Sequence, residues 1–454
     1  MLTWEYPPRI IGGIAPHVYD LSKELSKLDV ETTIVTCDFP GAPSREHVGN
    51  VDVHRVDSYR APTPDFPTWI YTMNLNLQMH AAELLGKGEF RPDIIHAHDW
   101  LVGAAAIGLK HMFRLPLVTT FHSTESGRRS GIHSDYQKML HETEVWLAYE
   151  TWKIICCSEY MANHVSAVLS VPSDKIVKIP NGVNFRKFMV PFNKQAFRAK
   201  YALPNEKIVL FVGRMVYEKG AAVLVDAVRK VLKNVDAKFI LVGEGYLREP
   251  LTKKVQQEGL TDKLYFTGFL ADSEVKKLYR IADVCVVPSL YEPFGIVCLE
   301  AMVAGAPVVV SNVGGLAEII YHEQNGVTVF PGDADSLAWG ILRVLLDKSF
   351  ADRIAATALK QVKEIYSWKA IAEKTLEFYQ GVNKQYELGS WKPRIKEANP
   401  SEPPICYPES PDRSEARALS FADLELKSTE ATLCQGELRM PMSRKGCTGL
   451  KRIP

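Results

Sequence analysis

Short apolar runs rich in β-branched residues recur along the whole chain, and stretches with helical spacing separate them. In the first part of the chain they cover residues 32–36, 51–56, 93–96, 117–121, 154–157 and 176–179. In the second part they cover residues 208–212, 239–242, 264–266, 284–287, 307–311 and 327–330. The helical stretches include residues 221–232, 273–281 and 335–346. Because the runs are apolar on both faces and alternate with helices, they predict parallel strands in doubly wound sheets, an α/β fold.

The alternation of strands and helices begins afresh near Leu203, which predicts two doubly wound domains. A chain of 454 residues is long enough for two or three domains of ordinary size. We place these domains at residues 1–195 and 196–365, followed by a further helix at 366–388. Residues 389–454 are rich in Pro, Ser, Glu and Arg and lack an apolar period, which predicts a disordered tail or a weakly packed appendage.

The composition excludes several classes of protein. Lys and Arg number 54 and Asp and Glu 53, a net charge of +1, whereas a dedicated nucleic-acid binder is strongly basic. No apolar run is long enough for a transmembrane helix, and the first residues, MLTWEYPP, do not form a signal peptide. Leu2, Thr3 and Trp4 look like the end of a strand that is either short or begins upstream. The eight cysteines lack the spacing of a disulfide framework or a zinc site, which predicts a reducing, cytoplasmic location.

The strongest local signal is the segment SLYEPFGIVCLE, residues 289–300. It follows a buried strand, and a helix is predicted to begin near Phe294, where free backbone N–H groups suit oxyanions or sugar hydroxyls. Glu292 is predicted at this N-terminus and Glu300 about two turns further along the same face. The two carboxylates could hold two hydroxylated groups of one ligand. The alternative is a carboxylate that satisfies the helix dipole and an unrelated surface glutamate.

Two cations follow another predicted strand, in the segment GRMVYEKG at residues 213–220. The carboxyl ends of parallel strands are where open α/β sheets bind ligands. Arg214 could bind two phosphate oxygens and Lys219 could add a compact charge, a pair suited to a departing diphosphate. The alternative is a surface ion pair between Arg214 and Glu218.

Gly12 and Gly13 precede a predicted helix, and without Cβ atoms they would let the backbone approach a phosphate closely. Asp99 and His122 each follow a predicted strand and could face one site from neighbouring strands. We expect His96 and His98 to point to opposite sides of their strand, so the sequence predicts no metal site.

Together these motifs resemble the retaining glycosyltransferases of the GT-B fold, family four, with their glycogen-synthase-like relatives. The resemblance covers roughly residues 2–385. It depends on Glu292 and Glu300 within PSLYEPFGIVCLEAM, followed by GAPVVVSNVGGLAEII, and on the glycine-containing segments PPRIIGG, IPNGVN and GRMVYEKG. The resemblance implies two Rossmann-like domains that face each other across a cleft, with residues 366–384 crossing back to the N-terminal domain.

The resemblance also implies roles for individual residues. Arg214 and Lys219 would hold the diphosphate of a nucleotide-sugar, and Glu300 would bind the ribose hydroxyls. Glu292 would contact the hydroxyls of the donor sugar. The backbone amides of Phe294, Gly295 and Ile296 would help to bind the donor sugar. His122 would lie near the anomeric carbon, and Asp99 would be a supporting group on the acceptor side. Thr267 and Phe269 would border the base.

The segments HAHDW and YEPFGIVCLEAM look most like those of starch and glycogen synthases. They imply a hexosyltransferase of glycogen biosynthesis that moves glucose from ADP- or UDP-glucose onto an α-1,4-glucan. The resemblance implies that no metal is needed, because Arg214 and Lys219 would replace it at the leaving group. No cofactor is expected either, because the nucleotide-sugar is a substrate. The chain has Pro8, Arg9, Ile10 and Ile11 where bacterial glycogen synthases carry a Lys-Thr pair before the glycines.

This departure keeps several alternatives open. The first is a family-four transferase that uses another nucleotide-sugar and a small, lipid or polysaccharide acceptor. More remote ones are a nucleotide-sugar epimerase and a non-catalytic sugar-binding protein. A nicotinamide-dependent oxidoreductase is disfavoured because the G-x-G-x-x-G pattern is missing after the first strand. The donor base, the sugar, the acceptor and the oligomeric state stay open.

Overall fold

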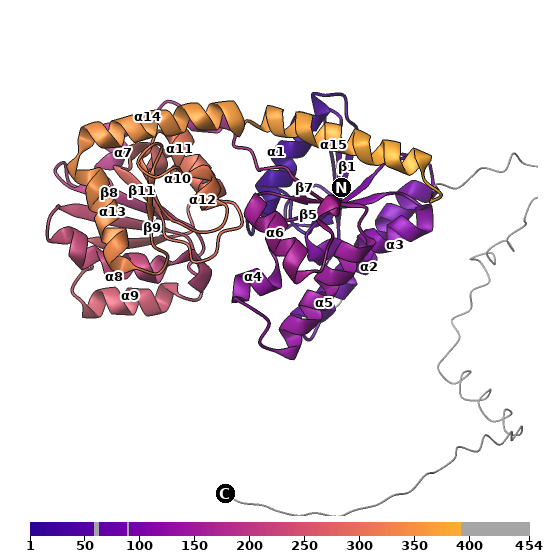
Figure 1. Ribbon diagram of the computed structural model, residues 1–454, viewed down its shortest axis with the longest axis horizontal. Coiled ribbons are helices and arrows are strands. Elements are labelled where there is room, and N and C mark those ends of the chain that lie inside the picture. The colour runs from indigo at the N-terminus through magenta and orange to yellow at the C-terminus, as the bar shows by residue number, and fades with distance from the viewer. Residues whose placement is uncertain (59–62, 89, 392–454) are drawn as a thin grey trace, which may run out of the picture. The chain divides into compact units, whose positions relative to one another are not determined.

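Figure 1 shows a computed structural model of the chain, which describes residues 1–58, 63–88 and 90–391. All of these residues belong to one compact unit. The predicted tail, apart from its first three residues, lies outside the described ranges.

The first part of the chain forms two small sheets that share one residue. The strands are β1 (Thr32–Cys37), β2 (Arg45–Val48), β3 (Val51–Val56), β4 (Ile95–His98), β5 (Leu117–Phe121), β6 (Lys153–Cys156) and β7 (Ile176–Lys178). Their orders are β1-β3-β2 and β4-β5-β6-β7, and β2 is the antiparallel edge strand. Leu2 bridges Val35 of β1 and Ala97 of β4, both in parallel, so it acts as a one-residue central strand between the two sheets.

The second part forms one six-stranded parallel sheet. Its strands are β8 (Lys207–Val212), β9 (Ala237–Val242), β10 (Leu264–Gly268), β11 (Val284–Val287), β12 (Val308–Ser311) and β13 (Val327–Val329). The order is β10-β9-β8-β11-β12-β13, so the direction in which strands are added reverses between β8 and β11. In open α/β sheets such a switch point is where ligands bind, outside the carboxyl ends of the strands.

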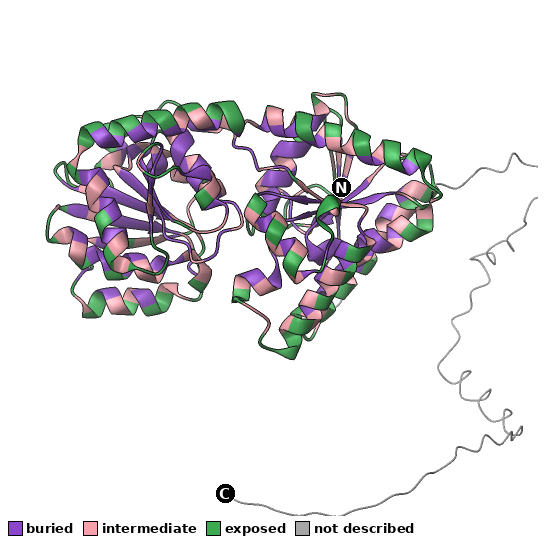
Figure 2. Cartoon of the chain, viewed as in Figure 1, coloured by how far each residue is buried: buried purple, intermediate pink, exposed green. Residues whose placement is uncertain are grey.

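Helices cover these sheets. They are α1 (Ile14–Ser26), α2 (Phe66–Gly86), α3 (Gly103–Phe113), α4 (Glu125–Arg129), α5 (Asp135–Glu150), α6 (Glu159–Val168), α7 (Lys194–Arg198), α8 (Ala221–Leu232), α9 (Arg248–Gln257), α10 (Asp272–Ile281), α11 (Ile296–Ala304), α12 (Leu316–Ile319), α13 (Ala334–Leu346), α14 (Lys348–Ile365) and α15 (Trp368–Leu388). Figure 2 shows buried strands and helices whose outer faces are exposed. This distribution explains why the central strands are apolar on both faces while the surface helices are amphipathic.

The last helix, α15, packs against the first helix. Trp368 and Ile371 share a buried cluster with Leu21 and Leu25 of α1. The hydroxyl of Tyr379 lies 2.6 Å from Nδ1 of His96. The C-terminal helix is therefore anchored on residues of the first part of the chain.

The fold class predicted from the sequence is confirmed: the chain is α/β with parallel sheets. The strand expected at residues 93–96 forms at Ile95–His98 instead, two residues later. No sequence pattern indicated β2, because three of its four residues are exposed and it carries no apolar run. Five cysteines in the described ranges, Cys37, Cys156, Cys157, Cys285 and Cys298, are buried free thiols. Within the same ranges, no helix is both long and apolar enough to span a membrane.

Candidate active site

The switch point of the second sheet brings a cation and a carboxylate together. The ammonium group of Lys219, after β8, lies 2.7 Å from Oε2 of Glu292, after β11. The hydroxyl of Ser289 donates to the same carboxylate oxygen at 3.0 Å. Glu292 is only 8% exposed, so most of its carboxylate depends on these two partners instead of water. Two of the predicted site residues, 73 positions apart, therefore share one site.

A glycine makes this approach possible. Gly220 follows Lys219 with a φ of +68°, and a Cβ atom at this position would overlap the carbonyl oxygen of Pro288 at the end of β11. Only glycine adopts this conformation readily and leaves that space free. The turn after β8 can therefore lie directly against the end of β11, which positions Lys219 beside Glu292.

Arg214 lies on the same turn, and it is exposed. Its guanidinium forms an ion pair with Glu218 at 3.1 Å, and 53% of its side chain is accessible. The ion pair that the sequence left as an alternative is therefore present. Because an exposed pair of this kind stabilises a protein by only about 0–1 kcal/mol, the guanidinium can exchange Glu218 for a stronger anion at little cost.

The two glutamates of the SLYEPFGIVCLE segment do not share a helical face. Helix α11 begins at Ile296, with Gly295 as its N-cap, so Glu292 precedes the helix by four residues. The prediction of two carboxylates two turns apart on one helix is wrong because the loop after β11 is longer than expected. Glu300 does lie in α11, half-buried, and accepts a hydrogen bond from the hydroxyl of Tyr279 at 3.0 Å. Burial raises the pKa of Glu300 above its ordinary value, although the Tyr279 hydroxyl opposes this change.

The start of α11 contacts the first part of the chain. A Cβ atom on Gly13, the N-cap of α1, would lie 3.2 Å from Cδ1 of Ile296. The hydroxyl of Ser158 donates to the carbonyl oxygen of Pro293 at 2.6 Å. Phe294 is buried and its ring meets that of Tyr366 edge-on, with centroids 6.0 Å apart. The loop that contains Gly12 and Gly13 therefore lies against the segment that follows β11. A site formed by residues from the first and the second part of the chain requires this contact.

The amides of the glycine loop already have a partner. The carboxylate of Glu5 accepts the backbone N–H groups of Ile11 at 2.5 Å and Gly12 at 2.9 Å. Sequence reasoning missed this pairing, because no pattern links Glu5 to residues six and seven positions later. The Glu5 carboxylate therefore binds the backbone amides that we expected to face a phosphate. The binding of a phosphate at Gly12 stays a prediction.

Asp99 and His122 come together at the ends of neighbouring strands β4 and β5. Oδ1 of Asp99 accepts the backbone N–H of His122 at 2.6 Å. Asp99 is 3% exposed, and burial raises the pKa of its carboxyl from 3.8 to about 7, although the amide hydrogen bond opposes this change. Asp99 therefore fixes the backbone on which the His122 ring is carried, which is a positioning function.

The ring of His122 belongs to a cluster that the sequence did not predict. One ring nitrogen from each of His17, His98 and His122 lies within 4.8 Å of the others. Burial lowers the pKa of all three imidazoles, so they are neutral at pH 7, the state that binds metals. His17 was missed, although it lies one helical turn after Gly13 and so returns to the same side of α1. The absence of a metal from the catalytic site stays a prediction.

The expectation that His96 and His98 point to opposite sides of β4 is wrong. Side chains two positions apart share a face of a strand, and the two ring centroids are 4.2 Å apart. His96 is nevertheless held elsewhere, with its Nε2 at 2.8 Å from the hydroxyl of Thr120.

Thr267 and Phe269 lie at the carboxyl end of β10, two strands away from β8. The Thr267 hydroxyl donates to the carbonyl oxygen of Gly268 at 2.8 Å, and Phe269 is 77% exposed. Both residues are on the same edge of the sheet as Lys219, and no contact joins them to the Lys219–Glu292 pair among the described hydrogen bonds.

The chain is an α/β protein with parallel sheets, and the switch point of its six-stranded sheet carries a cation, a carboxylate and the N-terminus of α11. These groups suit an enzyme that binds a phosphorylated, hydroxylated ligand. Two family models match this chain: "Glycosyltransferase Family 4" over residues 11–187 and "Glycosyl transferases group 1" over residues 193–361. An uncharacterized glycosyltransferase of Methanocaldococcus jannaschii is 42% identical over 383 residues, which are 84% of this chain and 97% of that protein. Glycogen synthase of Mycobacterium tuberculosis is 32% identical over 84% of this chain and 93% of its own length. The chain belongs to the group 1 and family 4 glycosyltransferases and is a hexosyltransferase.

Solved structures agree with the GT-B fold implied by the sequence. Sucrose-phosphate synthase of Thermosynechococcus elongatus superposes with a TM-score of 0.73 at 26% identity, covering 84% of this chain and 98% of that one. The catalytic domain of starch synthase IV of Arabidopsis thaliana, bound to ADP and acarbose, has a TM-score of 0.70 at 17% identity, with 84% and 98% covered. The second similarity concerns the fold alone.

Proposed function

We propose that this chain transfers glucose from ADP- or UDP-glucose to an α-1,4-glucan, with retention at the anomeric carbon and without a metal. The observation that carries the proposal is the 2.7 Å pair of Lys219 and Glu292 at the switch point. A cation for a diphosphate and a carboxylate for sugar hydroxyls are the two groups that a sugar diphosphate needs side by side. In the proposed complex, the diphosphate replaces Glu292 as the partner of Lys219, and Glu292 turns to the donor hydroxyls.

In the proposed reaction, the bond between the anomeric carbon and the diphosphate oxygen breaks while the acceptor oxygen bonds to that carbon on the same face. The acceptor hydroxyl proton passes to the departing diphosphate. Charge grows on the diphosphate as the bond breaks, so Lys219 and Arg214 stabilise the transition state more than the ground state. These two cations can supply the stabilisation that a metal ion supplies elsewhere.

The remaining roles in the proposed complex are those that the resemblance to the family implies. Glu300, held by the Tyr279 hydroxyl, binds the ribose hydroxyls in the proposed complex. His122 lies at the anomeric carbon, and Asp99 positions it through the backbone N–H. Thr267 and Phe269 border the base from the same edge of the sheet.

The division into domains near residue 195 and the cytoplasmic location are parts of the proposal. The matched ranges 11–187 and 193–361 support the division. The five free buried thiols support a reducing compartment.

The similarity to glycogen synthase, 32% identical over 93% of its length, supports the glucan as acceptor. Other relatives support the alternative of a small acceptor. A D-inositol 3-phosphate glycosyltransferase of Paenarthrobacter aurescens is 28% identical over 81% of this chain and 92% of that protein, and sucrose-phosphate synthase has a similar structure.

One experiment separates these possibilities: release of nucleoside diphosphate from ADP-, UDP- and GDP-glucose, each alone, with glycogen and with a sugar phosphate. The proposal predicts release that depends on glycogen and identifies the nucleotide. Release that ignores glycogen but increases with a sugar phosphate would replace the glucan by a small acceptor. A complete lack of release from all three donors would refute glucose as the transferred sugar.

A further inference from the structure

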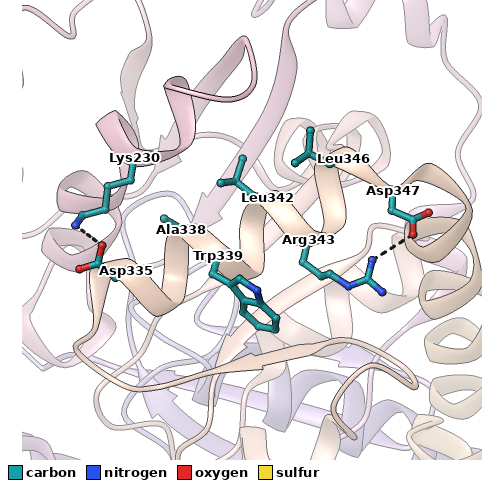
Figure 3. Close-up of a pocket in the computed structure, with 8 residues that line it drawn as sticks. All are labelled: Lys230, Asp335, Ala338, Trp339, Leu342, Arg343, Leu346 and Asp347. Carbon is teal, nitrogen blue, oxygen red and sulfur yellow. Dashed lines mark hydrogen bonds and ion pairs between the residues drawn. The ribbon is translucent and has the colours of Figure 1, made fainter.

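Helix α13 carries an open pocket of about 490 Å³ that has no part in the proposed donor site (Figure 3). Its lining includes Trp339, Leu342 and Arg343, and none of the residues assigned to the donor or the acceptor belongs to it. Ligand pockets in proteins commonly measure about 300–1,000 Å³ and combine an apolar lining with a few fixed polar groups. The size and lining of this pocket fit that description.

One of the residues that line the pocket presents an exposed indole ring. Trp339 is 48% exposed, although a residue of its size and apolarity is usually buried. The His322 ring is stacked parallel to it, with centroids 6.1 Å apart and an angle of 17°. His322 is itself fixed, because its Nδ1 accepts the backbone N–H of Thr328 at 3.1 Å. One face of the indole is therefore supported, and the ring is pre-organised as a platform.

Polar groups flank this platform along the helix. Asp335, Trp339 and Arg343 are four residues apart and so follow one another on one side of α13, about 6 Å per step. Asp335 forms an ion pair with Lys230 of α8. Figure 3 shows Trp339 between this pair and the pair of Arg343 with Asp347. The row therefore alternates polar, aromatic and polar groups.

Arg343 is held rigidly. Its guanidinium lies 3.0 Å from Oε1 of Glu323 and 3.2 Å from Oδ2 of Asp347. The same group lies 3.7 Å from the ring centroid of Phe350, which it covers. A side chain fixed by three partners loses little further entropy when a ligand binds to it.

The charges of the flanking groups decide the class of ligand. Lys230 and Arg343 are each paired with a carboxylate. An anionic ligand would therefore be repelled by Asp335 and Asp347, and a cationic ligand by Lys230 and Arg343. A neutral polyol can bind the same groups through its hydroxyls without disturbing this balance. The flat apolar face of a pyranose also packs well on an aromatic ring. A neutral sugar fits the pocket better than a nucleotide, a peptide terminus or a metal.

We infer that Trp339 and its flanking ion pairs form a second carbohydrate site, outside the active site, which holds the glucan acceptor on the enzyme. This inference rests on the proposed function for the identity of the sugar as a glucan. A site of this kind raises the local concentration of acceptor ends and improves the use of long chains over short ones.

The test compares variants by their retardation in gels that contain glycogen and by transfer to maltotetraose. Trp339→Ala should weaken binding to glycogen about tenfold, as loss of one aromatic stacking partner does, and leave the rate on maltotetraose unchanged. Trp339→Phe keeps an aromatic face and should retain most of the binding. Tyr149→Ala is the matched control, because Tyr149 is 79% exposed and lies on α5, outside the pocket.

Equal retardation of the wild type and Trp339→Ala would overturn the second site. Retardation that depends on Trp339, without any transfer to maltotetraose or glycogen, would keep the second site and refute the proposed function. If Trp339→Ala does not fold, the comparison is made with Trp339→Leu, which keeps apolar bulk at this exposed position but removes the aromatic ring. Full binding by Trp339→Leu would also overturn the site.

Discussion

Replacing Asp99 by asparagine should change how the stability of the protein depends on pH. Asp99 is buried, and its pKa is raised from 3.8 to about 7 because burial penalises the charged form. A carboxyl whose pKa is higher in the folded than in the unfolded state favours folding below the unfolded pKa. That contribution is lost as the pH rises through the folded pKa.

The magnitude follows from the two pKa values of Asp99. Between about pH 5.5 and pH 8.5, the folded carboxyl ionises only in the upper half of the interval, whereas the unfolded carboxyl is ionised throughout. At about 1.4 kcal/mol per pH unit, the wild type should lose about 2 kcal/mol of unfolding free energy through Asp99 over this interval. The asparagine side chain of the variant does not titrate, and its amide oxygen can still accept the N–H of His122.

The assay is urea unfolding of the wild type, Asp99→Asn and the control Asp93→Asn, at about pH 5.5, 7.0 and 8.5. Asp93 is exposed and precedes the same strand, β4. The difference in unfolding free energy between the wild type and Asp99→Asn should change by about 2 kcal/mol in favour of the variant as the pH rises. The Asp93→Asn curve should stay parallel to the wild type. Parallel curves for all three proteins would refute the argument that burial holds Asp99 in its protonated form.

Three further predictions concern the active site. Lys219→Ala and Arg214→Ala should each lower kcat by about 10²–10³, as loss of one transition-state charge partner does, while circular dichroism stays unchanged; near-normal kcat in both would refute the proposed role of these two cations at the diphosphate. Tyr279→Phe removes the hydroxyl that holds Glu300 at 3.0 Å and should raise the KM for the donor about tenfold with a smaller change in kcat; an unchanged KM would show that Glu300 does not depend on this bond. EDTA should leave the steady-state rate unchanged, and a strict requirement for an added divalent metal would contradict the metal-free mechanism and direct attention to His17, His98 and His122.

The elements of the fold could be predicted well where burial dictates the pattern. Helix α8 begins and ends at the predicted residues. The glycine before it marks its start, and its periodic buried apolar residues define its length. The strands flanking the switch point, β8 and β11, were also found. Their pairing followed from general rules of doubly wound sheets, which made Lys219 and Glu292 candidates for one site.

The features that sequence reasoning missed share a physical cause. Glu5 reaches the amides of Ile11 and Gly12 through a loop, and loop conformations leave no periodic trace in a sequence. The start of α11 at Ile296 depends on the conformation of Gly295 and not on an apolar period. The imidazole cluster requires three elements to be placed in space, and spacing along one strand says nothing about His17.

The Lys219–Glu292 pair also bears on how the active site selects its ligand. A nucleoside diphosphate without a sugar would take Lys219 and leave the largely buried Glu292 carboxylate with Ser289 alone. An unpaired buried charge costs several kcal/mol, so this ligand incurs a penalty that the complete nucleotide-sugar avoids by offering hydroxyls to Glu292. Glu292→Gln removes the charge and therefore the penalty.

We expect Glu292→Gln to bind the nucleoside diphosphate at least about tenfold more tightly relative to the nucleotide-sugar than the wild type does. Isothermal titration calorimetry with both ligands on both proteins measures this ratio, and Ser289→Ala serves as a control that weakens the support of Glu292 without removing its charge. If Glu292→Gln changes both affinities by the same factor, the carboxylate does not distinguish a donor from its leaving group. Its pairing with Lys219 would then serve the stability of the loop after β11 and not the choice of ligand.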